Sequence, residues 1–178
     1  MSKNTYVALL RGINVGGNNP LPMQSLLQLL TTLGCEQVKT YIQSGNVVFA
    51  ADKRDWSQMI AEAIAEEFGF RPAVLVLGAS AFRDITNAVP FPRDSGKALH
   101  AFFLADPPVN PDLTAIESLA SESEKFALRE GAFFLYAPDG IGRSKLAAKV
   151  EKLLGVEVTA RNWNTVDKLL TMLEESIC

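Results

Sequence analysis

The sequence predicts an α/β protein of the α+β kind, made of two βαββαβα repeats at residues 1–90 and 91–178. Apolar runs of strand length alternate with helical patterns, and the order of elements in the first half recurs in the second. Two glycine pairs keep the same offset of 86 residues: Gly45 corresponds to Gly131, and Gly69 to Gly155. The repeats either form separate cores or intertwine into one.

The first repeat starts with an apolar strand that runs into a loop rich in glycine. Leucines at helical spacing follow Pro22, which suits the first turn of a helix, and Gly34 ends the pattern. Ser44-Gly45 reads as a two-residue hairpin turn, and Gly69 ends the second helix. The predicted elements are a strand at 6–11, a helix at 22–33, strands at 38–42 and 46–49, a helix at 55–68, a strand at 73–77 and a short helix capped by Ser80.

The second repeat follows a proline-rich segment at 89–92. Glu130-Gly131 is its hairpin turn, and Gly155 ends its longest predicted helix before the last strand. The predicted elements are a strand at 99–104, a short helix opened by Asn110-Pro111, strands at 125–128 and 133–136, a helix at 145–154, a strand at 156–160 and a helix at 165–173.

Composition excludes several classes of function. The net charge of −3 provides no global positive field for nucleic acid or an anionic membrane. Cys35 and Cys178 show no metal-ligand spacing, and His100 is the single histidine, so we expect no metal, no cofactor and no disulfide framework. The first apolar run is too short for a signal peptide or a membrane span. We therefore expect a soluble cytoplasmic protein.

Four segments carry a family resemblance: Arg11 to Gly17, and residues 40–49, 140–146 and 159–166. In order and spacing they resemble the signatures of the bacterial family known as domain of unknown function 1697, over nearly the whole chain. The resemblance implies a duplicated, ferredoxin-like fold and no assigned activity. Relatives often carry lysines in the first loop, where this chain has Asn18 and Pro20.

The polar motifs fall at particular strand ends. In a βαββαβ repeat, the exit of the first strand and the hairpin turn lie at one end, and the exits of the third and fourth strands lie at the other. Residues 11–17 and 43–46 therefore share one end of the first repeat, and residues 140–145 and 161–165 share the opposite end of the second. We hypothesise that a pseudo-two-fold axis joins these ends into one composite polar site between the repeats.

The candidate ligand-binding residues all come from these motifs. Segment 140–145 follows a strand and opens a predicted helix, an arrangement that suits an anion. Structural roles compete: loop and hairpin chemistry for the first-repeat residues, helix capping for Ser144 and for Asn162 or Asn164, and a salt bridge for Arg161. The candidates are Arg11, Asn14, Gly16, Gly17, Gln43, Ser44, Asn46, Gly142, Arg143, Ser144, Lys145, Arg161, Asn162 and Asn164.

No catalytic constellation emerges. His100 lies in an apolar strand, and Ser44 and Ser144 have no identifiable base. The leading hypothesis is a binding site for a small anionic or nucleotide-like ligand. One alternative is single-stranded nucleic-acid binding, which needs exposed aromatic rings. Another is an interaction or scaffold module whose motifs are structural only. The rings available for base stacking are Phe102, Phe103, Phe133, Phe134 and Tyr136. No pattern indicates an oligomeric state.

Overall fold

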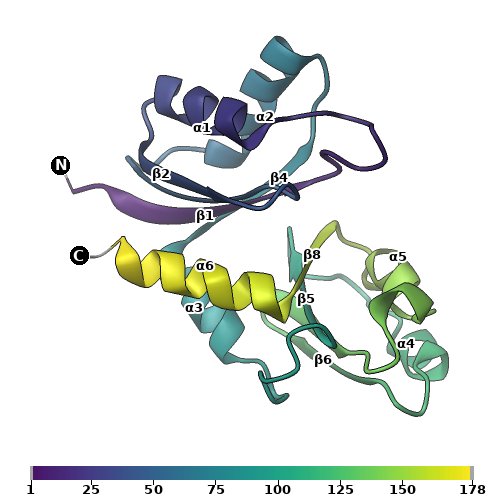
Figure 1. Cartoon of the computed structure of the whole chain (residues 1–178). Helices are drawn as coiled ribbons and strands as arrows, with labels where there is room; N and C mark the ends of the chain where they lie inside the picture. The colour runs from purple at the N-terminus through teal and green to yellow at the C-terminus, as the bar shows by residue number, and fades with distance from the viewer. Residues whose placement is uncertain (1, 177–178) are drawn as a thin grey trace. The chain divides into compact units, whose positions relative to one another are not determined.

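The computed structural model describes residues 2–176 and contains two four-stranded antiparallel sheets, each accompanied by helices (Figure 1). The strand orders are β2-β3-β1-β4 and β6-β7-β5-β8, so the second sheet repeats the arrangement of the first. This is the order of a ferredoxin-like βαββαβ repeat. The predicted fold class is therefore confirmed.

The first sheet places β3 between β2 and β1, antiparallel to both, so β1 and β2 run in the same direction. The prediction that the polar motifs share one strand end depended on this parallel direction of β1 and β2. The elements are β1 (Asn4–Arg11), α1 (Met23–Thr32), β2 (Glu36–Tyr41), β3 (Asn46–Ala51), α2 (Trp56–Phe68), β4 (Ala73–Gly78) and α3 (Ala79–Asn87).

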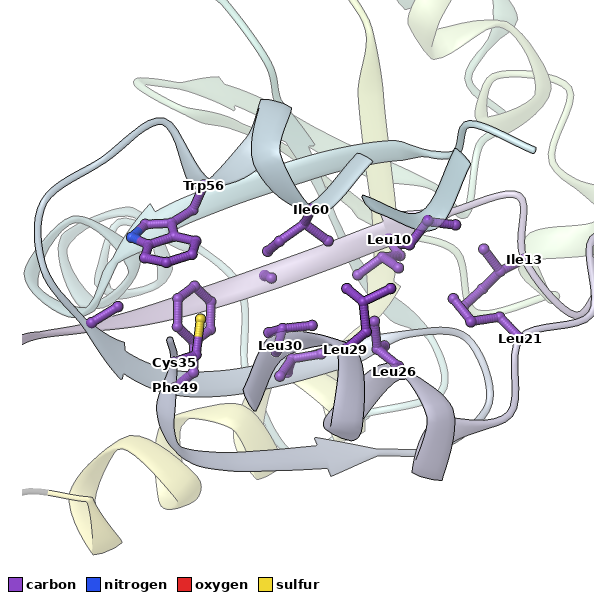
Figure 2. Packing of buried hydrophobic residues seen from close by; sticks show 14 residues of the cluster. Leu10, Ile13, Leu21, Leu26, Leu29, Leu30, Cys35, Phe49, Trp56 and Ile60 are labelled. Atoms are coloured by element: carbon purple, nitrogen blue, oxygen red, sulfur yellow. The ribbon is translucent and has the colours of Figure 1, made fainter. Parts of the chain in front are cut away.

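Helices α1 and α2 cover one face of this sheet, and an apolar core fills the space between (Figures 1 and 2). Leu26 and Leu30 are fully buried because they recur at helical spacing on the inner face of α1. Phe49 of β3 lies between Tyr6 and Trp56, with ring centroids 5.4 and 5.7 Å away. Burying one such side chain contributes about 1.5–3 kcal/mol.

The second sheet has the same topology, with α4 and α5 on one of its faces (Figure 1). Phe102 and Phe133 point to that face and pack edge to face, 6.0 Å apart. The elements are β5 (Leu99–Leu104), α4 (Leu113–Leu119), β6 (Lys125–Arg129), β7 (Ala132–Tyr136), the 3-10 turns η1 (Ile141–Arg143) and η2 (Ala147–Lys149), α5 (Val150–Leu154), β8 (Val158–Asn162) and α6 (Trp163–Glu175).

The chain forms two compact units, Met1–Arg83 with Leu169–Cys178, and Asp84–Lys168. The boundaries fall inside α3 and α6, so the end of α6 belongs to the first unit, where Glu175 lies 3.8 Å from Lys39 of β2. The two units are groups of residues that contact one another in space, whereas the predicted repeats are defined by the order of elements along the chain. The predicted division into repeats at residue 90 therefore stays a prediction.

Several local predictions were wrong. The strand predicted at 156–160 lies at Val158–Asn162, and the helix predicted to open at Asn110-Pro111 is capped by Asp112 and begins at Leu113. Four residues, 42–45, form the first hairpin turn in place of two, and its first and last members, Ile42 and Gly45, have positive φ. Ser80 lies inside α3 instead of capping it. The helix predicted at 145–154 shrinks to α5, because Ser144 is extended and two 3-10 turns precede it. Helix α6 begins two residues earlier than predicted, since Asn162 accepts the Thr165 N–H at 3.0 Å.

Candidate functional site

The first glycine-rich loop is a small hairpin finger held by its own backbone. The N–H of Asn14 bonds to the carbonyl of Asn19 at 3.0 Å, and that of Asn18 to Val15 at 2.9 Å. Between them, Gly16 and Gly17 have φ of 56° and 79°, a pair of left-handed conformations suited to a tight turn. The polypeptide therefore fixes the shape of this loop without a ligand.

The amide of Asn14 joins the finger to the hairpin turn, and the amide of Asn46 braces the hairpin turn itself. Asn14 Nδ2 donates to the carbonyls of Leu21 and Gln43, both at 2.9 Å, and its Oδ1 accepts the Leu21 N–H at 2.7 Å. Asn46, fully buried, donates to the Tyr41 carbonyl and to Ser44 Oγ, both at 3.0 Å. Buried amides in such networks are structural, since breaking them leaves polar atoms unpaired.

The first-repeat candidates thus lie at one strand end, as predicted: Asn14 bonds to Gln43 of the hairpin turn, and Asn46 bonds to Ser44 within it. Arg11, the last residue of β1, lies opposite Ala73 of β4 and is exposed. Gly16, Gly17 and Gln43 are also exposed. The structure favours turn chemistry for most of this motif.

The second-repeat motifs also share one end. Tyr136 pairs with Leu99 and Asn162 with His100, so β7 and β8 both leave the sheet beside the start of β5. The composite site that we predicted between this end and the polar end of the first repeat stays a prediction.

Arg161 does not join the other cations of this end. It pairs with Ala101, one residue out of step with Phe102, so it lies on the sheet face opposite α4 and α5. Its Nη1 donates to the Ala160 carbonyl at 2.9 Å, and burial lowers the pKa of the guanidinium to about 10. Asn164 is exposed, and its amide lies against Gly96.

Arg143 and Lys145 line an open pocket of about 450 Å³ beside α4, which we call the Arg143 pocket. The Ser144 Oγ accepts the Ala147 N–H at 3.0 Å, and Ser144 and Leu146 are buried, so the alternating residues Arg143 and Lys145 are exposed. The exposed Gly142 lies between Ile141 and Arg143 in η1. The lining comprises Ser118, Leu119, Ser121, Glu124, Asp139, Gly140, Arg143 and Lys145.

The basic and acidic side chains that line this pocket do not form ion pairs with one another. Among residues 2–176, neither Arg143 nor Lys145 has a carboxylate oxygen within 4.0 Å. Glu124 instead accepts the Ser121 N–H at 3.1 Å, and Asp139 accepts the Ser123 hydroxyl. Sequence reasoning missed both acids, although the polar run at 121–124 and Asp139 just before Gly140 were visible signals.

The predicted helix N-terminus at this pocket was wrong. Helix α5 has five residues and begins only at Val150, beyond the lining segment. The positive charge of the pocket therefore comes from two side chains and not from a helix dipole.

A family model described as Protein of unknown function (DUF1697) matches residues 3–134. The chain belongs to this family. Among solved structures, conserved bacterial protein SP0830 from Streptococcus pneumoniae is similar, with 26% sequence identity and a TM-score of 0.71. The alignment covers 97% of this chain and 99% of that one. No curated protein matches the chain.

The histidine and the buried cysteine of this DUF1697 protein lie inside the fold. His100 is buried in β5, which lowers its pKa, and the buried Cys35 thiol has a pKa raised to about 11 by desolvation. Residues 2–176 hold no cluster of three His, Cys, Asp or Glu that suits a metal ion. No helix in that range is long and apolar enough to cross a membrane.

The aromatic rings on which nucleic-acid binding depended offer little surface for base stacking. Phe102, Phe103, Phe133 and Phe134 are each at most 5% exposed, and Tyr136 is half-buried. Stacking on a base needs an exposed ring face.

Proposed function

We propose that this DUF1697 protein binds a small anionic ligand in the Arg143 pocket. One observation carries the proposal: two exposed cations, Arg143 and Lys145, line the same hollow and have no ion-pair partner in the described chain. Their separation by Ser144 alone keeps both near one ligand, because the buried Ser144 fixes the backbone between them.

The two cations suit a phosphate or carboxylate group. The guanidinium of Arg143 can donate two parallel hydrogen bonds to such a group, and Lys145 adds a mobile ammonium. Because both side chains are exposed and association costs entropy, we expect weak binding of a simple anion, with a dissociation constant near 1 mM, about −4 kcal/mol. Any chemistry at this pocket would be electrostatic stabilisation of a phosphoryl or carboxylate group.

Isothermal titration calorimetry with inorganic phosphate at low ionic strength tests the proposal. We expect Lys145→Ala to weaken binding about tenfold, the effect of losing roughly 1.4 kcal/mol. Lys149→Ala is the matched control, because Lys149 is exposed on the same segment but does not line the pocket. Equal phosphate affinity in all three proteins, or no binding by the wild type, would remove the proposed function.

We also infer that the two repeats arose by internal duplication. Gly45 and Gly131, which end the two hairpin turns, have φ of 90° and 81°, and the helix-ending Gly69 and Gly155 have φ of 78° and 70°. The shared backbone conformations at one sequence offset support this origin. The free thiol of Cys35 supports a reducing, cytoplasmic location.

A further inference from the structure

We infer that the ligand of the Arg143 pocket is a phosphorylated sugar or polyol. Its phosphate lies at Arg143 and Lys145, and its hydroxyl groups donate to Glu124 and Asp139. This inference rests on the proposed function and adds the chemical class of the ligand. The observation behind it is that two carboxylates and two cations line one hollow without an ion pair between them.

The carboxylates retain capacity to accept hydrogen bonds from a ligand. Glu124 receives the Ser121 N–H at 3.1 Å, and Asp139 receives the Ser123 hydroxyl. An ionised carboxylate offers about four acceptor sites, so each has several left. These contacts also hold the two side chains in place, which reduces the entropy lost when a ligand binds.

Two serines of the lining add acceptor oxygens for the ligand's hydroxyl groups, beside those of Glu124 and Asp139. Ser118 donates its proton to the Ala115 carbonyl at 3.0 Å, which leaves the lone pairs of its oxygen for a ligand donor. Ser121 Oγ lies 3.2 Å from Ser123 Oγ, so the two hydroxyls bond to each other. A polyhydroxylated ligand matches such a surface because each of its hydroxyls both donates and accepts.

The residues that line the pocket disfavour nucleotides and dicarboxylates as ligands. Leu119 is its single apolar member, and no aromatic ring occurs among the lining residues, so a nucleobase has no stacking partner. A dicarboxylate would bring its second negative charge towards Glu124 or Asp139. The volume of about 450 Å³ falls in the range of small-molecule sites.

Calorimetric titration with inorganic phosphate, glucose 6-phosphate and AMP tests this specificity. We expect the wild type to bind glucose 6-phosphate about tenfold more tightly than phosphate or AMP, a net gain of about 1.4 kcal/mol after the cost of desolvating the two carboxylates and ordering the ligand. In the Glu124→Gln/Asp139→Asn protein, that preference falls to about threefold or less, whereas the affinity for phosphate stays equal or rises. Circular dichroism confirms that the variant is folded.

The outcomes separate the two proposals. Equal affinity for glucose 6-phosphate and phosphate in the wild type, with binding still about tenfold weaker in Lys145→Ala, overturns the sugar inference and leaves anion binding intact. A preference for glucose 6-phosphate that persists in the double variant also overturns the sugar inference. Absence of binding by every probe overturns both.

Discussion

The side-chain amide of Asn14 donates a 2.9 Å hydrogen bond to the carbonyl oxygen of Gln43, joining two loops separated by 29 residues. The hairpin turn is also tied to the end of β1, where the Leu10 N–H bonds to the Gly45 carbonyl at 2.8 Å. The first loop and the hairpin turn therefore form one rigid end of the first repeat. Rigidity of this kind is a property of the fold and needs no ligand.

Asn14→Ala should destabilise the protein without affecting anion binding. Removal of the amide leaves the Leu21 N–H and two carbonyls without these partners, and we expect the free energy of unfolding to fall by about 1–3 kcal/mol. Urea denaturation followed by circular dichroism measures the loss. Wild-type stability, or loss of phosphate binding in a folded variant, would show that the amide has another role.

Gly45→Ala should destabilise the protein more than Gly69→Ala. Both glycines have positive φ, which disfavours alanine by about 1–2 kcal/mol. A Cβ on Gly45 would also lie 2.8 Å from Leu10 Cβ and Ile13 Cδ1, whereas one on Gly69 meets no atom within 4 Å. Overpacking adds about 1–3 kcal/mol at Gly45 alone. Thermal melting of the two variants checks the order, and equal losses would contradict the steric argument.

The topology could be predicted because strong local signals agreed with it. The β5 strand was predicted with its observed bounds at 99–104, and α2 matched within one residue because Asp55 caps it and Gly69 ends it. The same topology placed residues 11–17 beside 43–46, which Asn14 and Gln43 confirm.

The basic residues of the pocket could be predicted from the sequence but its acidic residues could not, and Arg161 was assigned to it in error, for two physical reasons. The strand order fixes which loops share an end, but the side of the sheet on which a residue lies depends on register, so Arg161 was wrongly grouped with Arg143 and Lys145. Glu124 and Asp139 come from two loops whose side chains approach one lining only through tertiary packing, which no local pattern encodes.

Arg161→Ala should leave phosphate binding unchanged. Arg161 lies on the sheet face opposite α4 and α5, outside the lining of the Arg143 pocket. Calorimetry should therefore give an affinity within about twofold of the wild type, less than 0.5 kcal/mol. A tenfold loss in a folded Arg161→Ala protein would place this guanidinium in the binding site and contradict the face assignment.

Cys35 should react slowly with thiol reagents while the protein is folded. Desolvation raises its pKa from 9.0 to about 11, so below pH 9 about 100-fold less thiolate forms than in the unfolded chain. The rate should rise with pH up to about 11. Iodoacetamide labelling of a Cys178→Ser protein, with and without guanidinium chloride, measures this difference. Equal rates in both conditions would mean that Cys35 is accessible.

The central claim is that the anion site lies at Arg143 and Lys145. A ¹⁵N NMR titration with inorganic phosphate tests it most directly, because it reports on every backbone amide at once. We predict saturable shifts at residues 140–145 in the wild type and a midpoint about tenfold higher in Lys145→Ala, with Lys149→Ala behaving as the wild type. Shifts confined to residues 11–17, or none at saturating phosphate, would contradict the claim.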